Sequence, residues 1–157
     1  LFGTDINEST AIGHRQFRLE VIGDFEFYIF EESASVKRYL GSGENPAVPA
    51  YITAQPFGQK NSTAPVSLPV EKIGKTAFRD MKHVKSVSLP DTIVRIRAGA
   101  FKGSGLTTFT GPDSLLSVGD EAFADCTNLE EVILPKTILQ TGEKVLENSP
   151  LSVLEYK

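Results

Sequence analysis

The stretch Ile73-Gly74-Lys75-Thr76-Ala77-Phe78 returns three times along the chain in altered form. The later copies read Ile96-Arg97-Ala98-Gly99-Ala100-Phe101, Val118-Gly119-Asp120-Glu121-Ala122-Phe123 and, more weakly, Thr141-Gly142-Glu143-Lys144-Val145-Leu146. The Phe positions and Leu146 are therefore 23, 22 and 23 residues apart. A repeat of this length is typical of solenoids, in which each unit buries its apolar side only by stacking on the next.

Each repeat also contains one predicted strand. An apolar-x-x-apolar segment begins at Val84, Leu106, Leu129 and Leu151. A proline follows three of these segments, at Pro90, Pro112 and Pro135. Proline has no N–H and so ends ladder pairing, which fits a strand terminus. Residues 66–157 thus predict about four repeats of 22–23 residues whose strands pair in parallel, each with a turn-rich return segment.

Residues 15–40 have a different pattern. Phe17, Leu19 and Val21 alternate with charged residues, as in a strand with one buried face. A two-residue turn at Gly23-Asp24 precedes a second, aromatic strand over 25–30, and a third is expected near 35–40. We interpret this part as an antiparallel β-meander that caps the open end of the solenoid.

The sequence therefore divides into four parts of one continuous domain. Residues 1–14 form an N-terminal lead, and 15–52 hold the meander and a degenerate first repeat around 47–52. Residues 53–65 are rich in Pro, Gly, Ser and Thr and are expected to form a surface loop. A loop of this length is either functional or a simple insertion, and the sequence does not distinguish the two.

Residues 122–135, Ala-Phe-Ala-Asp-Cys-Thr-Asn-Leu-Glu-Glu-Val-Ile-Leu-Pro, resemble one whole repeat of the BspA-like leucine-rich repeats of the Treponema pallidum type. Residues 23–41 resemble the β-rich cap that often precedes such arrays. The resemblance implies an α/β-type, right-handed solenoid dominated by short strands and preceded by an antiparallel β cap. Three departures are Arg97 in place of the usual Gly, the Thr110-Gly111 break, and Val145-Leu146 in place of Ala-Phe.

The same resemblance implies a bacterial cell-surface or secreted protein that binds other proteins, with adhesion to host or matrix proteins included. Its signal or anchor would lie outside this segment, because the chain begins Leu1-Phe2 without Met, a basic region or an apolar core. Members of such a family share a scaffold more reliably than a ligand.

Composition restricts the partners further. The chain has 157 residues, 40% of them hydrophobic, and a formal net charge of −4. A negative balance argues against nucleic acid or an anionic membrane as the main partner. No run of 18 apolar residues occurs, so no membrane insertion is expected.

No catalytic, cofactor or metal site is expected from the sequence. Cys126 falls in the same column as Met81, Ser104 and Ser149, which marks a packing position rather than a reactive thiol. His14 and His83 lack partners at the spacing of a nucleophilic triad, and we interpret both as solvated. Glu130 and Glu131 point to opposite faces of a strand, and Glu31-Glu32 fall in a turn. We expect a protein that is not an enzyme.

The exposed face of the stacked strands is the candidate protein-binding face. If the apolar columns point inward, strand alternation directs eight side chains outward: Ser86, Ser88, Thr108, Thr110, Glu131, Ile133, Val153 and Glu155. The plain alternative is a solvated sheet of β-tolerant residues, since the face lacks the Trp, Tyr and Arg typical of hot spots. A rival aromatic patch contains Tyr28, Phe30, Tyr51 and Phe57, more of them expected in the core than at the surface.

Two functions follow as hypotheses. The first is a module that docks an unidentified protein, a host or matrix component. The second is a structural spacer that presents a neighbouring domain and has no ligand of its own. In either case the last strand, near 151–156, would leave an unpaired edge, through which self-association is a further hypothesis.

Overall fold

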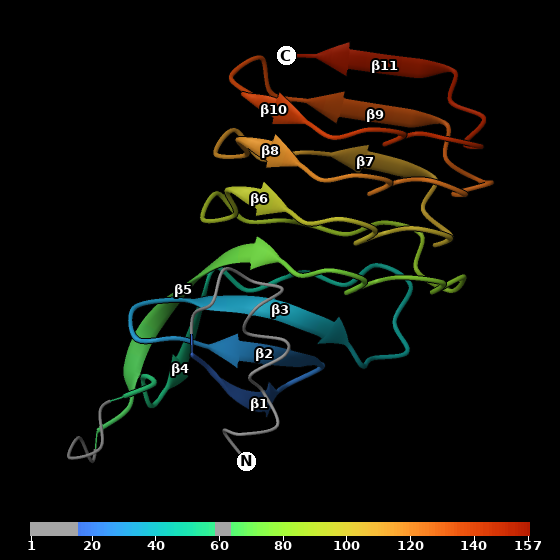
Figure 1. The fold of residues 1–157 in the computed structure, drawn as a ribbon. Coiled ribbons are helices and arrows are strands. Elements are labelled where there is room, and N and C mark those ends of the chain that lie inside the picture. Colours follow the sequence, from blue (N-terminus) through green and yellow to red (C-terminus); the bar gives the residue numbers. More distant parts are fainter. Residues whose placement is uncertain (1–15, 59–63) are drawn as a thin grey trace.

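The computed structural model describes residues 16–58 and 64–157, and within them every regular element is a β-strand (Figure 1). In chain order these are β1 Arg18–Ile22, β2 Phe25–Ile29, β3 Ala34–Tyr39, β4 Tyr51–Ala54, β5 Val66–Ile73, β6 Arg95–Ile96, β7 Thr108–Thr110, β8 Ser117–Val118, β9 Glu131–Leu134, β10 Gln140–Thr141 and β11 Val153–Tyr156. The expected solenoid with short strands is confirmed. Its return segments contain turns and two-residue strands, and no helix lies in these residues.

Two ladders run along the solenoid. The predicted repeat strands β7, β9 and β11 form a three-stranded parallel sheet in the order β11-β9-β7. The return segments supply a second parallel ladder, in which β5, β6, β8 and β10 pair in succession. This second ladder was not predicted as strands, because each of β6, β8 and β10 is only two residues long.

The antiparallel cap is confirmed and joins the second ladder. β1, β2 and β3 form the meander, and Ile22 pairs with Phe25 across the two-residue turn whose Gly23 has φ 60°. β3 then pairs in parallel with β5. The meander thus covers the first coil with backbone hydrogen bonds as well as side chains, because β3 occupies the side of β5 that faces away from β6 (Figure 1).

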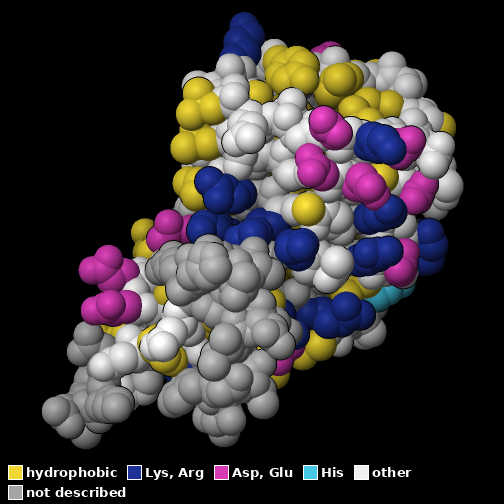
Figure 2. Space-filling model, viewed as in Figure 1, with side chains coloured by type: hydrophobic (Ala, Val, Ile, Leu, Met, Phe, Trp, Pro, Cys, Tyr) yellow, Lys and Arg dark blue, Asp and Glu magenta, His cyan; other side chains and the backbone are white. Residues whose placement is uncertain are grey.

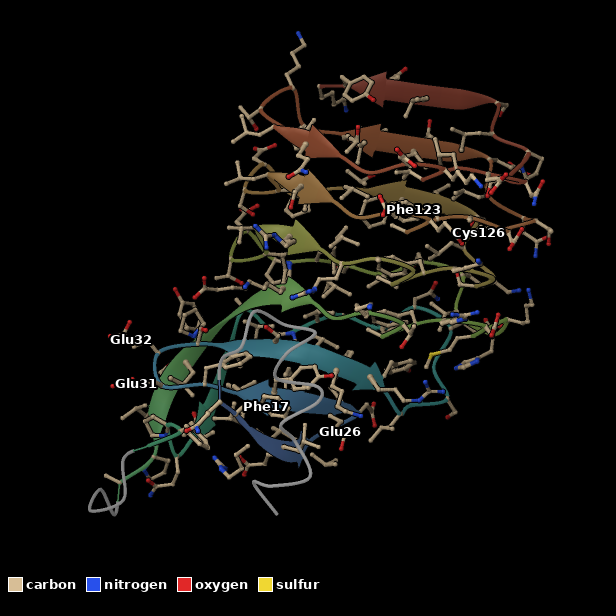
Figure 3. The ribbon with its side chains drawn as sticks, viewed as in Figure 1. Phe17, Glu26, Glu31, Glu32, Phe123 and Cys126 are labelled. Atoms are coloured by element: carbon tan, nitrogen blue, oxygen red, sulfur yellow. The ribbon has the colours of Figure 1, made fainter. Side chains whose placement is uncertain are left out.

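A ladder of stacked phenylalanines fills the interior. Phe78, Phe101 and Phe123 are each 0% exposed, and their ring centroids are 5.0 and 5.2 Å apart with interplanar angles of 10° and 1°. Tyr39 and Phe25 of the cap continue the ladder below Phe78, at 5.7 and 6.3 Å. Figure 3 shows Phe123 and Cys126 inside the third coil, with Glu31 and Glu32 directed outward from the β2–β3 turn. The recurring Phe is therefore the continuous core.

Each Ala-Phe turn needs two residues in the left-handed backbone region. One column contains Thr76, Gly99, Glu121 and Lys144, and the other Asp80, Gly103, Asp125 and Asn148, with φ between 54° and 71°. Only one member of each column is glycine, and Asp and Asn tolerate this region better than most residues. Backbone N–H groups in these turns donate to the coil above, as from Phe78 to the carbonyl of Ala100 at 2.7 Å. The left-handed residues thus allow the turns themselves to stack as a third ladder.

The segment before the first full repeat is more ordered than the sequence indicated. β4 pairs antiparallel with the first half of β5, so Thr53 and Ala54, placed in the surface loop, belong to a strand. Residues 59–63 of that loop lie outside the described residues. Ala47 forms a parallel bridge with Ser88, and the Val48 N–H donates to the Ser88 carbonyl at 2.9 Å. The repeat strand predicted from Val84 is likewise reduced to this single bridge at Ser88, and the first regular repeat strand is β7.

Candidate protein-binding face

The eight candidate residues form two adjacent rows across the repeat strands. Strand register places Thr108 beside Glu131 and Glu131 beside Val153, and likewise Thr110 beside Ile133 and Ile133 beside Glu155. The Glu130 N–H donates to the Thr107 carbonyl, and in the same way the Thr107 N–H donates to the Lys85 carbonyl at 3.0 Å. The register between neighbouring repeats therefore continues to the segment that follows Lys85. Ser86 and Ser88 are therefore the next members. The first row is Ser86, Thr108, Glu131 and Val153; the second row is Ser88, Thr110, Ile133 and Glu155.

All eight side chains reach solvent, whereas the residues between them are buried in the first three repeats; Leu154, between Val153 and Glu155 on β11, is 44% exposed. Ser88, Thr108, Thr110 and Glu155 are exposed, and Ser86, Glu131, Ile133 and Val153 are half-buried. Val87, Phe109 and Val132, which alternate with them, are at most 7% exposed. The structure thus brings the predicted residues together on one surface, with hydroxyls near the cap and Glu, Ile and Val toward the C-terminal coils.

The rows extend into the cap by two residues that sequence reasoning missed. The Ser86 hydroxyl donates to Asn45 Oδ1 at 2.8 Å, and Ala47 pairs with Ser88. Asn45 and Ala47 lie in a Gly/Pro-rich stretch with no strand alternation, so only the register with the first full repeat reveals them. Their position widens the face to five adjacent segments, which are β7, β9, β11 and the bridged segments at 45–47 and 86–88.

The rival aromatic patch does not form. Tyr28 and Phe30 are 9% and 3% exposed and pack with Phe17, whose ring lies edge-on to that of Tyr28 at 4.8 Å. Tyr51 is 59% exposed and Phe57 is half-buried. Three of the four side chains are therefore core or partly core, and one exposed ring does not make a hot-spot cluster.

The residues considered for chemistry occupy structural positions. Cys126 is fully buried, its thiol contacts the Ser104 hydroxyl at 3.5 Å, and burial raises its pKa despite that hydrogen bond. His83 is exposed, lies 3.2 Å from the Gly41 carbonyl through Nε2, and stacks on Tyr39. His14 lies outside the described residues. In the described ranges no group of three or more metal-binding side chains gathers.

Native Cys126 is expected to resist thiol reagents. Burial removes access, and a raised pKa lowers the thiolate fraction at pH 8, so both effects act in the same direction. With 5,5′-dithiobis(2-nitrobenzoate), release of thionitrobenzoate is expected to be slow in buffer and complete within mixing time in concentrated urea. Fast native reaction would show that the Cys126 column is not a packing position.

Charge is segregated along the solenoid axis. Residues 66–102 contain eight Lys and Arg against three Asp and Glu, whereas 103–157 contain three against nine. Figure 2 shows the dark blue side chains across the middle of one face and the magenta ones above them. At the boundary Lys102 donates to Glu121, and this hydrogen bond raises the Lys102 pKa. Burial, followed by repulsion from Arg95, lowers the pKa of Arg97. The net charge of −4 therefore hides a basic band over the first two coils.

Comparison with known proteins agrees with this architecture. The family model of the BspA type leucine rich repeat region matches residues 50–157 as six copies, over the range in which the structure builds about four coils. No curated protein matched the sequence. No helix capable of crossing a membrane is found in residues 16–58 and 64–157.

Solved structures with the same fold come from several bacteria. A leucine-rich repeat protein from Bacteroides capillosus is 24% identical with TM-score 0.74, and the match covers 88% of this chain and 98% of that one. A leucine rich cell surface protein from Faecalibacterium prausnitzii is 19% identical with TM-score 0.65, covering 89% of this chain and 43% of that one. The T. pallidum leucine rich repeat protein is 22% identical with TM-score 0.54, covering 88% and 67%.

At these identities the structural matches show the fold, whereas the family model covers more than half of the chain. With the phenylalanine ladder and the stacked parallel strands, this match shows that the chain belongs to the BspA-type leucine-rich repeat family.

Proposed function

We propose that this chain is a non-enzymatic module that docks a protein partner on the two rows of its repeat-strand face. Leucine-rich repeats are a general protein-interaction fold, and solenoids bind along their continuous strand surfaces. The observation that carries the proposal is the alignment of eight solvent-reaching side chains in two rows, with buried neighbours between them in the first three repeats. A regular, rigid surface of this kind costs little ordering entropy on binding.

The chemistry of the rows indicates the kind of partner surface. Ile133 and Val153 are half-buried diagonal neighbours near the C-terminal end, and Glu131 and Glu155 flank them. An apolar side chain of the partner would pack on the first pair, and its Lys or Arg would meet the carboxylates at the rim. A host or matrix protein in contact with a bacterial cell surface is the proposed partner class, supported by the cell surface protein among the structural matches.

The partner class is tested by binding of the purified chain to immobilised collagen, laminin, fibronectin and fibrinogen. We expect saturable binding to at least one of them that persists at physiological salt, since the contact is partly apolar. Absence of binding to all four would instead favour the spacer hypothesis, in which the solenoid only positions a neighbouring domain.

Self-association through β11 is a separate proposal. Within residues 16–58 and 64–157, β11 pairs with β9 alone, and Leu139, Leu154 and Tyr156 on the last coil are 80%, 44% and 50% exposed. An unpaired edge with apolar neighbours is a template for another strand. Light scattering between about 10 and 500 µM is expected to show a mass that rises with concentration.

Leu154→Lys should abolish this rise, because a charge at a strand edge opposes pairing. Leu116→Lys is the matched control, since Leu116 is 40% exposed on the side of the third coil rather than at the end. A constant monomer mass for the unaltered chain, or equal effects of the two substitutions, would count against edge pairing.

A further inference from the structure

A pocket of about 580 Å³ lies where the cap meets the first coil, away from the two rows. It forms because the last residue of β3 docks under the first turn: the Tyr39 N–H donates to the Ala77 carbonyl at 3.1 Å. The chain then leaves through Leu40 and Gly41, while the coil turns away at Asp80. The pocket thus has one wall from the cap and one from the solenoid.

The floor of this pocket is fixed and almost closed to solvent. Tyr39 and Met81 are only 3% and 8% exposed. The Tyr39 hydroxyl donates to the Gly43 carbonyl at 3.1 Å, and its ring stacks on His83 at a centroid distance of 6.1 Å. His83 in turn lies 3.2 Å from the Gly41 carbonyl. These contacts hold the lining in place before any ligand arrives, which lowers the cost of binding.

The rim holds two guanidinium groups from different layers. Arg38 belongs to β3 and is exposed, and Arg79 belongs to the first turn, with 48% of its side chain exposed. Guanidinium groups recognise planar carboxylates through paired hydrogen bonds. Arg79 lies within the basic band and Arg38 lies on the cap beside it, so their field would draw anionic groups toward this end of the solenoid.

The charge balance decides which anion fits. Asp80 lies 3.6 Å from Arg79, so Arg38, Arg79 and Asp80 together carry a formal charge of +1 with His83 neutral. A single positive charge matches one carboxylate. A phosphate dianion or a sulfated polymer would bring more negative charge than the pocket offsets, next to an existing carboxylate. The exposed Leu40 of the lining has no role for such ligands but offers a contact for a hydrophobic side chain.

We propose that this pocket binds one carboxylate of an acidic peptide segment, with a neighbouring apolar side chain packing on Leu40, which lines the pocket and is 51% exposed. The carboxylate would contact Arg38 and Arg79. Its source is either an Asp or Glu side chain or the carboxyl end of a chain. None of the lining residues belongs to the two rows, so this site and the strand face can succeed or fail independently.

The test is an NMR titration of the full, ¹⁵N-labelled chain with short synthetic peptides. The probe is acetyl-Gly-Leu-Glu-Leu-Gly-amide, with the Gln analogue, an analogue carrying only a free carboxyl end, and inorganic phosphate as further arms. We expect shifts centred on the amides of residues 38–41 and 76–83 and a dissociation constant of about 0.1–1 mM. The Gln analogue should bind at least about fivefold more weakly, since it lacks the charge-assisted pairs.

Two substitutions and a control locate the site. Arg38→Gln and Arg79→Gln should each weaken the Glu probe by about fivefold or more. Lys144→Gln removes the same charge from an exposed position in the last coil and should leave binding unchanged. Unchanged urea midpoints would show that all three variants fold, and both arginines are exposed enough for this to be expected.

Three results would overturn the proposal. Chemical-shift changes that map to other residues would show that the peptide does not bind in this pocket. Equal affinities for the Glu and Gln probes would show that the pocket does not recognise the carboxylate. Phosphate that binds here more tightly than either carboxylate probe would replace the proposed ligand class. Among the carboxylate probes, the stronger of the Glu and free-end peptides identifies the source.

Discussion

Phe101→Ala is expected to lower the free energy of unfolding by about 3–5 kcal/mol, the usual loss for a buried aromatic truncated to alanine. Phe101 is 0% exposed and stacks between Phe78 and Phe123, with Phe109 at 5.7 Å. Its removal leaves a cavity in the middle of the ladder, where coils on both sides are held by their own hydrogen bonds and cannot close in. Urea unfolding followed by circular dichroism measures the change.

Leu146→Ala is the control from the same column. Leu146 is half-buried in the last coil, with no coil of the structure above it. Much of its surface is already in water, so the loss should be below about 2 kcal/mol. Equal losses for Phe101 and Leu146 would mean that the aromatic ladder does not carry the core.

Gly74→Ala is expected to cost about 1–3 kcal/mol, the range for added volume in a packed interior. The Gly74 N–H donates to the Val36 carbonyl at 2.7 Å, where β3 of the cap docks on the first coil. A Cβ on Gly74 would lie 2.4 Å from that same oxygen. The obstacle is backbone and cannot rotate away, so the cap would have to shift from the solenoid.

Lys75→Ala is the matched control, because Lys75 is adjacent and exposed and should change stability by no more than about 0.5 kcal/mol. A loss of cap contact in Gly74→Ala should also bring faster amide hydrogen exchange in β3 than in β9. Uniform protection in both strands would show that the cap does not depend on this close approach.

Much of the architecture could be predicted because each repeat has the same types of side chain at the same positions. The Phe ladder, the parallel repeat strands and the meander follow from Phe101 and its equivalents, from the apolar columns, and from strand alternation over 17–30. The two rows follow from the same alternation, since inward Val132 requires outward Glu131 and Ile133.

What could not be predicted depends on backbone geometry and on docking. The left-handed turns hold Thr76, Glu121 and Lys144, residue types that carry no signal for positive φ. The β4–β5 pairing includes Pro69, which in sequence argues against a strand interior. The place of Asn45 on the strand face and the pocket lined by Arg79 exist only because the cap packs on the first coil. Neither segment by itself contains a sequence pattern that predicts this contact.

The strand-face proposal is tested most directly by a matched pair of double substitutions. Thr110→Lys with Ile133→Lys alters two register partners on the rows, one exposed and one half-buried. Gln140→Lys with Ser117→Lys alters two register partners on the other ladder, with the same exposures and the same added charge. Both variants should remain folded, with a small loss of stability in the second because Ser117 Oγ accepts a hydrogen bond from Arg95 Nε.

The measurement is the dissociation constant of each variant for the matrix protein that the unaltered chain binds, by surface plasmon resonance at physiological salt. We predict a loss of about tenfold or more for the Thr110 and Ile133 variant, since a buried apolar contact and its surroundings are disrupted. The Gln140 and Ser117 variant should bind within about twofold of the unaltered chain, because its charges lie off the contact. Equal affinities for the two variants would contradict binding through the repeat-strand face.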